Sequence, residues 1–256
     1  MLAVAYGVIY LFVFIFGICI GSFLNVLIYR IPLHINIAKG RSFCPKCGNT
    51  LLARDLVPLF SFLVLRGRCR FCGDPISPRY PLVESLGGAA AIVSVIVWGM
   101  TWHALIAFAA CCVLVTVAFI DIDTMEIPDS MHVALIVLGI CAVFAVPMPA
   151  LVSRLIGIVA VSVPMILLDL IIKDSFGGGD IKLCAACGFL LGWRALIVGT
   201  FIAIIGGGIY GIYLLASKKK DRKGHFAFGP FLAAGMAVAL FVGDAIWYAY
   251  LGSFGL

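Results

Sequence analysis

Two aspartates stand beside apolar stretches of the sequence, where a charged side chain is costly and is a functional candidate by default. Asp121 directly follows the apolar run LVTVAFI, and Asp180 follows three glycines in SFGGGDIKL. Two carboxylates that lie close together can share one proton. One can then act as a base on a water molecule while the protonated partner polarises a peptide carbonyl, as in aspartic proteases. These residue types are therefore compatible with peptide-bond hydrolysis.

The glycines before Asp180, Gly177–Gly179, permit positive φ and the close approach of a substrate backbone. They do not form a nucleotide-binding loop, because the Lys-Ser/Thr pair of such loops is absent. An alternative is that Asp180 only caps the helix that follows it. Three further acids near Asp121 are compatible with ordinary solvated loop positions: Asp123, Glu126 and Asp129.

Four cysteines have the spacing of a metal site. Cys44 and Cys47 form one Cys-x2-Cys pair, Cys69 and Cys72 form a second, and 21 residues separate the pairs, as in four-cysteine zinc ribbons. A glycine follows each pair and permits the tight turn that directs backbone N–H groups at thiolates. Four thiolates complete a tetrahedron and leave no position for water, so we expect a structural zinc ion.

The composition is that of an integral membrane protein, since 64% of the 256 residues are hydrophobic and 12% are charged. A helix needs about 20 residues to cross a bilayer core of about 30 Å. We therefore predict an all-α polytopic protein of about eight transmembrane helices, near residues 2–28, 82–99, 101–120, 131–147, 150–172, 182–193, 195–216 and 229–252. The six remaining cysteines fall in these segments, where we expect them to pack in the core: Cys19, Cys111, Cys112, Cys141, Cys184 and Cys187.

Basic residues in short loops mark the cytoplasmic side of a membrane. With eight spans, sixteen of the 18 Lys and Arg residues fall on one side, nine of them within residues 30–79. This asymmetry predicts a cytoplasmic cysteine loop and both termini outside, and it places Asp121 and Asp180 at the cytoplasmic face. Contact with anionic lipid explains the net charge of +6, so we predict a lipid bilayer and no nucleic acid as partner.

The stretches DIDTMEIPD (residues 121–129) and GGGDIKL (177–183) resemble the paired signature of the type IV prepilin peptidase family, which are intramembrane proteases with a G-x-G-D motif. The first signature of that family has an aspartate seven residues before a proline, and Asp121 and Pro128 hold those places here. The resemblance implies that Asp121 and Asp180 are the catalytic pair. It also implies a supporting role for Asp123.

The N-terminal third is similar to the bacterial form of the family, in which cleavage is joined to N-methylation of the new amino terminus. The similar stretches are GSFLNVLIYRIP (21–32), CPKCG (44–48) and RGRCRFCGDPISPRYPLVE (66–84). The resemblance implies a methyltransferase-like region in residues 1–100, with its zinc loop at 30–80, and an aspartyl protease region in residues 101–256. It also implies S-adenosyl-L-methionine as methyl donor; the donor site stays open, although Arg79 and Glu84 suit a carboxylate and an amine.

By the same resemblance we expect a bifunctional enzyme of the bacterial inner membrane that removes the basic leader of type IV prepilins or pseudopilins at the cytoplasmic face. Two alternatives remain on the residues alone. An ion-coupled transporter would use the same acids as a proton relay, although such sites lie near the bilayer midplane. A zinc-ribbon membrane scaffold without catalysis would tolerate replacement of Asp121 and Asp180.

Overall fold

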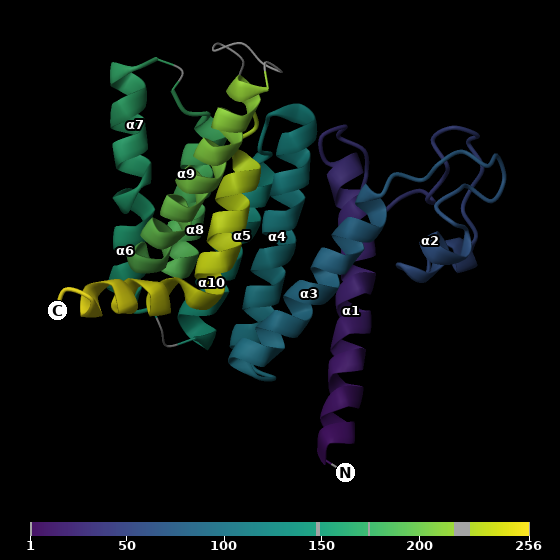
Figure 1. The fold of residues 1–256 in the computed structure, drawn as a ribbon, viewed down its shortest axis with the longest axis horizontal. Helices are drawn as coiled ribbons and strands as arrows, with labels where there is room; N and C mark the ends of the chain where they lie inside the picture. The colour runs from purple at the N-terminus through teal and green to yellow at the C-terminus, as the bar shows by residue number, and fades with distance from the viewer. Residues whose placement is uncertain (1, 147–148, 174, 218–225, 256) are drawn as a thin grey trace. The chain divides into compact units, whose positions relative to one another are not determined.

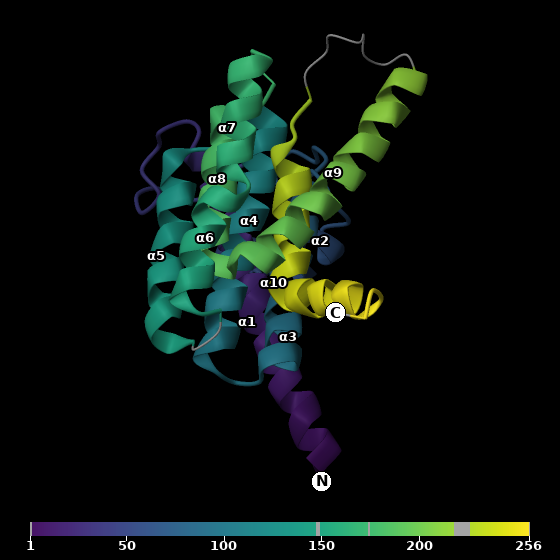
Figure 2. The same ribbon diagram turned by 90° about the vertical axis from the view of Figure 1, so that its left-hand side faces the viewer.

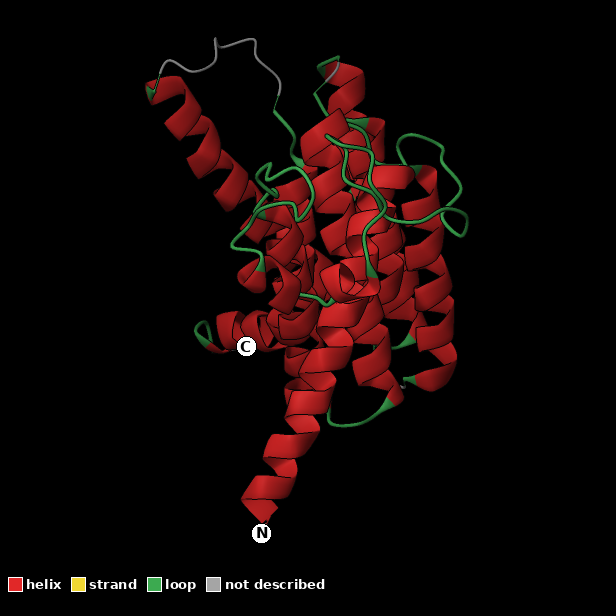
Figure 3. Ribbon diagram, turned by 90° about the vertical axis from the view of Figure 1, so that its right-hand side faces the viewer, coloured by secondary structure: helices red, strands yellow, loops and turns green. Residues whose placement is uncertain are grey.

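The computed structural model describes residues 2–146, 149–173, 175–217 and 226–255. In these residues the regular structure is helical, and Figure 3 shows helices joined by loops. Extended pairing in the described ranges is limited to two isolated bridges, Phe43 with Thr50 and Arg68 with Pro75. The chain forms two compact units, Met1–Gly99 and Met100–Leu256. The predicted all-α membrane class is confirmed.

The first unit is built on two long helices, α1 (Leu2–Arg30) and α3 (Arg79–Trp98), which pack against each other. Glycines bring their backbones together: a β-carbon on Gly17 would lie 2.6 Å from the carbonyl oxygen of Gly87. Small residues permit such close contact between helices in membranes. The 3-10 helix η1 (Ala53–Leu56) and the short α2 (Phe60–Val64) interrupt the loop that carries the four cysteines.

The second unit is a bundle of seven described helices (Figure 1): α4 (Trp102–Thr124), α5 (Asp129–Ala145), α6 (Leu151–Ala160), α7 (Ser162–Ile171), α8 (Gly178–Leu191), α9 (Trp193–Ala216) and α10 (Gly229–Gly252). Helix α8 packs against α5, α6, α7, α9 and α10, so it forms the centre of the bundle. Gly188 of α8 packs against Gly157 of α6. The two backbones are so close that a β-carbon on either glycine would clash with the carbonyl oxygen of the other.

Six helical stretches are long and apolar enough to cross a membrane: Val4–Arg30, Arg79–Trp98, Trp102–Thr124, Leu151–Ile171, Trp193–Ala216 and Gly229–Gly252. The stretch Leu151–Ile171 combines α6 and α7, which are separated at Val161. Pro164 explains the break, because it lacks the N–H that would bond to the carbonyl of Ala160. The two other predicted spans correspond to α5, with 17 residues, and α8, with 14. The predicted count of eight is therefore not confirmed.

Four of the six cysteines that we expected in the core are buried, namely Cys111, Cys112, Cys184 and Cys187. For Cys19 and Cys141 the expectation is wrong, because both side chains are exposed on the outer faces of their helices. An apolar segment predicts burial in the membrane but does not tell the face toward lipid from the face toward protein.

The last turn of α4 and the first turns of α5, α8 and α10 lie at one end of the bundle (Figures 1 and 2). Asp121 lies in the last turn of α4, and Asp180 lies in the first turn of α8. The helix order thus brings together two carboxylates that are 59 positions apart in the sequence.

Candidate active site and cysteine cluster

Asp121 is buried, with 5% of its surface exposed. Its Oδ2 accepts a hydrogen bond of 2.9 Å from the backbone N–H of Gly229, the first residue of α10. A helix N-terminus carries partial positive charge and unpaired N–H groups, so it favours a carboxylate at this position. Gly229 has no room for a side chain, because a β-carbon would lie 2.6 Å from the same oxygen.

Asp180 is partly buried in the first turn of α8. Its carboxylate turns back toward the start of the helix, since a β-carbon on Gly177 would lie 3.3 Å from Oδ2. Asp121 and Asp180 lie within range of electrostatic interaction. The arrangement therefore presents a buried, hydrogen-bonded carboxylate near a second carboxylate at one end of the bundle.

The glycines before Asp180 differ from our expectation in their backbone conformation. Gly177 has φ −67 and ψ 137, and Gly178 and Gly179 begin the helix, so none of the three has the positive φ that we predicted. Gly179 is needed for close packing instead, because a β-carbon there would lie 3.1 Å from Cβ of Ile127. Nothing lies within 4 Å of the corresponding position at Gly178.

Two acids outside the pair hold the surrounding segments. The Oδ1 of Asp169 accepts the backbone N–H groups of Ser175, at 3.0 Å, and Phe176, at 3.3 Å, just before the glycines. Asp129 begins α5, and its Oδ1 lies 2.7 Å from Nζ of Lys182 on α8. The Lys182 ammonium lowers the pKa of the Asp129 carboxyl below its ordinary value. Asp129 is thus solvent-exposed, as expected, and it also forms an ion pair between α5 and α8.

The four cysteines of the first unit form a cluster that could hold a metal ion. The sulfur atoms of Cys44, Cys47, Cys69 and Cys72 all lie within 4.8 Å of one another, and none is in a disulfide. The Sγ atoms of Cys44 and Cys72 are 3.9 Å apart. Tetrahedral coordination with Zn–S bonds of about 2.3 Å would separate the sulfurs by about 3.8 Å, so the cluster has the dimensions of a zinc site.

The two Cys-x2-Cys turns have the same backbone geometry. The N–H of Gly48 bonds to the carbonyl of Cys44, and the N–H of Gly73 bonds to that of Cys69, each at 2.9 Å. Gly48 and Gly73 have φ of 70 and 74, a region that glycine adopts without strain. These glycines form the tight turns that the sequence predicts.

Twenty curated proteins match the chain significantly, including prepilin leader peptidase/N-methyltransferases from Burkholderia pseudomallei, Aeromonas hydrophila and Bacillus subtilis. The Burkholderia protein is 34% identical over 94% of this chain and 87% of its own length. The Aeromonas protein is 34% identical over 99% of both chains, and the Bacillus protein 33% identical over 93% of this chain and 96% of its own.

The chain belongs to the prepilin leader peptidase family. Two family models agree: the bacterial peptidase A24 N-terminal domain matches residues 15–98, and the type IV leader peptidase family matches residues 108–212. No solved structure matches the chain significantly. Together with the six apolar stretches, membership of this family indicates a multi-pass inner-membrane protein.

In this member of the prepilin leader peptidase family, a buried carboxylate supports the cysteine loop. Glu84 of α3 is buried, and its Oε2 accepts the backbone N–H of Leu59 at 2.7 Å. Leu59 has a φ of 59, which is unusual for a residue with a side chain, and this bond helps to hold it. Arg79 is the first residue of α3. One oxygen of Glu84 is thus already used within the protein.

An ion pair lies inside the cysteine loop. Arg70, between the second pair of cysteines, donates from Nε and from its terminal nitrogen to Oδ1 of Asp55, at 2.8 and 2.7 Å. The Arg70 guanidinium holds the pKa of the Asp55 carboxyl below its ordinary value. Asp55 belongs to η1, so this pair connects η1 to the cysteine cluster.

Sequence reasoning missed Gly229 and His132 at the aspartate end of the bundle. His132 of α5 is buried, and its Nε2 lies 3.1 Å from the carbonyl oxygen of Gly179. Gly229 is followed by Pro230, and a proline near the first helical position is a helix-start signal. That signal locates the start of α10 but not its contact with Asp121.

Proposed function

We propose that this protein removes the leader peptide of type IV prepilins or pseudopilins with Asp121 and Asp180, and that it N-methylates the new amino terminus. The names of the matching relatives support both activities. The observation that carries the proposal is the buried Asp121 carboxylate, held by the N–H of Gly229 within electrostatic range of Asp180. Nothing in the structure or the relatives favours an ion-coupled transporter.

In the proposed hydrolysis, the two carboxyl groups hold one proton between them. The ionised group takes a proton from water, whose oxygen adds to the carbonyl carbon of the scissile peptide bond. The protonated group donates to the carbonyl oxygen at the same time. The C–N bond then breaks, and the leaving amine takes up a proton as the carbonyl forms again. Gly229 keeps Asp121 in place during this cycle, because its N–H occupies Oδ2.

Membrane depth defines the substrate that we propose. The pair lies at the end of a transmembrane bundle, so it would meet a chain just outside the apolar core rather than at the midplane. The basic loops favour the cytoplasm for this end, with both chain termini outside. The enzyme would therefore cut a prepilin directly before its hydrophobic helix and leave the short basic leader in the cytoplasm.

We further propose that Cys44, Cys47, Cys69 and Cys72 hold one structural zinc ion. The sulfur distances fit tetrahedral coordination, and the glycine turns direct both pairs inward. Zinc bound by four thiolates supplies a cross-link and has no open position for a substrate. The loop is too small to bury much core of its own, so such a cross-link would hold η1 and α2 in place.

For methyl transfer we propose residues 1–100 as the region that acts with S-adenosyl-L-methionine, and residues 101–256 as the protease region. The match of residues 15–98 to the N-terminal family domain supports this division. Glu84 lies at the junction of α3 and the cysteine loop, where its carboxylate holds Leu59. It would support the donor region through the loop.

The proposal is tested by co-expression with a prepilin and measurement of the pilin mass. We expect loss of the leader when the protein is present, and an added methyl mass when S-adenosyl-L-methionine is supplied to purified protein. A pilin that keeps its leader in the presence of folded protein would contradict the peptidase assignment. Cleavage without methylation would contradict the second activity alone.

A further inference from the structure

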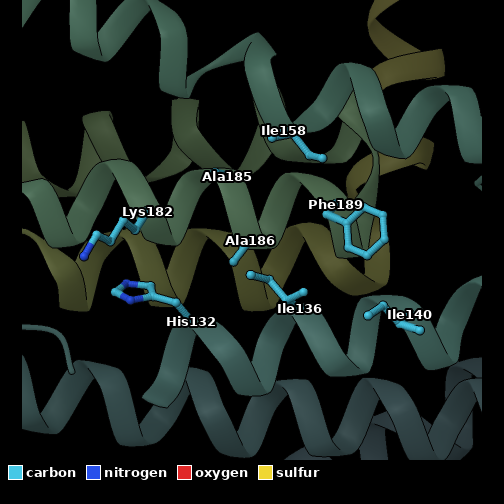
Figure 4. Close-up of a pocket in the computed structure, with 8 residues that line it drawn as sticks. All are labelled: His132, Ile136, Ile140, Ile158, Lys182, Ala185, Ala186 and Phe189. Atoms are coloured by element: carbon cyan, nitrogen blue, oxygen red, sulfur yellow. The ribbon is translucent and has the colours of Figure 1, made fainter. Parts of the chain in front are cut away.

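His132 occupies an unusual position for a histidine in an apolar helix. It lies one turn into α5, 5% of its surface is exposed, and its ring borders a cavity of about 400 Å³ (Figure 4). Apolar side chains of α5, α6 and α8 line most of this cavity, and Lys182 stands with His132 at its polar end (Figure 4). A buried polar ring among apolar groups is costly unless it makes a specific hydrogen bond.

The hydrogen bond of His132 has a defined direction. Its Nε2 lies 3.1 Å from the carbonyl oxygen of Gly179, and a carbonyl oxygen only accepts, so Nε2 carries the hydrogen. Nδ1 faces Oδ1 of Asp129 at a distance of 3.4 Å. The bond to Gly179 exists whether or not Nδ1 is protonated, because Nε2 donates in both forms.

Gly179 is the residue directly before Asp180, and it is contacted from two directions, by α5 and by the segment that precedes α5. Its carbonyl receives the His132 donor, and its α-carbon packs against Ile127, where a β-carbon would lie 3.1 Å from the Ile127 Cβ. The carbonyl of Gly179 already lies within the α8 helix. The imidazole therefore adds a contact between helices rather than replacing one that α8 lacks.

The connection from Asp121 to His132 is short and has a defined backbone. The N–H of Met125 bonds to the carbonyl of Asp121 at 2.9 Å, and Met125 ends α4 in the left-handed conformation, with φ 55 and ψ 29. The hydroxyl of Thr124 bonds to the carbonyl of Ile120 at 3.0 Å. Helix α5 then begins at Asp129. The segment that follows Asp121 thus leads directly into α5, whose His132 contacts Gly179 at the start of α8, next to Asp180.

We propose that His132 is a positioning residue that sets the place of Asp180 relative to Asp121 through its hydrogen bond to the Gly179 carbonyl. This inference rests on the proposed hydrolytic pair. The Asp129–Lys182 ion pair joins the same helices, but 75% of the Asp129 side chain and 59% of the Lys182 side chain are exposed. Exposed ion pairs contribute little. The buried His132 bond therefore determines the register of α5 and α8 near Asp180.

Three variants of His132 test the proposal in purified enzyme with a prepilin substrate. His132→Leu removes the donor, and His132→Asn keeps an amide that is too short to reach Gly179. His132→Gln places an N–H near the position of Nε2. We expect kcat to fall on the order of 10- to 100-fold for Leu and Asn, the loss typical of misplacing a group by about 1 Å. We expect KM to change little and Gln to restore most of kcat.

Ile136→Ala is the matched control for lost packing, because Ile136 lies one turn further on the same face of α5 and lines the same cavity (Figure 4). Thermal stability is measured for every variant. Equal kcat values for the His132→Asn and His132→Gln variants would overturn the proposal. It would also be overturned if kcat fell in proportion to the loss of thermal stability, with the same relation in the His132 variants and in Ile136→Ala. Asp180→Asn is assayed in parallel. Cleavage by Asp180→Asn would refute the hydrolytic pair itself. If Asp180→Asn is inactive but His132→Asn is fully active, only the positioning role of His132 is refuted.

Discussion

Replacement of Gly229 by alanine perturbs the proposed catalytic pair through a single methyl group. The new Cβ would lie 2.6 Å from Oδ2 of Asp121 and 2.9 Å from its Cγ. Ordinary van der Waals contact begins at 3.4 Å, so the start of α10 or the carboxylate must move by about 0.8 Å. Such a movement lengthens the hydrogen bond from Gly229 to Asp121, which is 2.9 Å in the native protein.

Two consequences of this displacement have different magnitudes. Overpacking of a filled interior costs about 1–3 kcal/mol of unfolding free energy. A shift of about 1 Å at a reacting group lowers the rate on the order of 100-fold. We therefore expect folded Gly229→Ala protein with kcat on the order of 10- to 100-fold below wild type, because the water and the scissile carbonyl no longer meet both carboxyl groups.

The assay is prepilin cleavage by purified enzyme in detergent, together with thermal unfolding. Gly235→Ala is the control for packing, since its β-carbon would clash with the carbonyl oxygen of Gly199 in α9, away from Asp121. Gly252→Ala is the neutral control, because nothing lies within 4 Å of its added β-carbon. Wild-type kcat in Gly229→Ala, or an equal fall of kcat in Gly235→Ala, would refute the reasoning.

The remaining predictions concern the far end of α8 and the cysteine cluster. Arg154 is buried and donates to the carbonyls of Pro149, Phe189 and Leu190, the last two in the final turn of α8. Arg154→Met should lower the unfolding free energy by about 1–3 kcal/mol for each carbonyl left unpaired, while the folded protein keeps its kcat. Unchanged thermal stability would contradict the role of Arg154 in pairing these carbonyls. Chelator titration should remove zinc and abolish methylation at concentrations that leave cleavage intact, and Cys44→Ser should lower the zinc content while Cys19→Ser keeps it. Simultaneous loss of both activities would show that the loop supports the whole fold.

Much of the helical framework is predictable from the sequence, because long apolar runs and helix-start signals locate transmembrane helices. The last predicted span, 229–252, coincides with α10, and the span predicted at 195–216 differs from α9 by two residues at its start. The paired Cys-x2-Cys turns also follow from local pattern, since each cysteine pair and its glycine lie within five residues. Local spacing determines such turns.

Contacts between distant residues are not predictable in this way. Gly229 bonds to Asp121 across 108 positions, and His132 bonds to Gly179 across 47. A glycine or histidine in an apolar helix has many possible neighbours, and only the packing of α4, α5, α8 and α10 selects one. Pro164 was a local signal for the break between α6 and α7, which the prediction of one continuous span at 150–172 overlooked.

The glycines before Asp180 show that the conformational freedom of glycine does not by itself determine which backbone conformation the residue adopts. Freedom to adopt positive φ led us to expect a turn, but Gly178 and Gly179 are helical and their absent side chains serve packing. At Gly48 and Gly73 the same freedom is used. The difference lies in the neighbours: Ile127 approaches Gly179, whereas nothing lies within 4 Å of an added β-carbon at Gly48 or Gly73.

The most direct test of the proposed chemistry is the mass of a prepilin incubated separately with wild-type enzyme, Asp121→Asn and Asp180→Asn. Asparagine keeps the size of each side chain but cannot share the proton, so both variants should remain folded and leave the leader attached. Asp244→Asn, at an exposed position of α10, serves as the control for loss of a carboxylate and should cleave. Removal of the leader by either folded variant of the pair would contradict the assignment of Asp121 and Asp180.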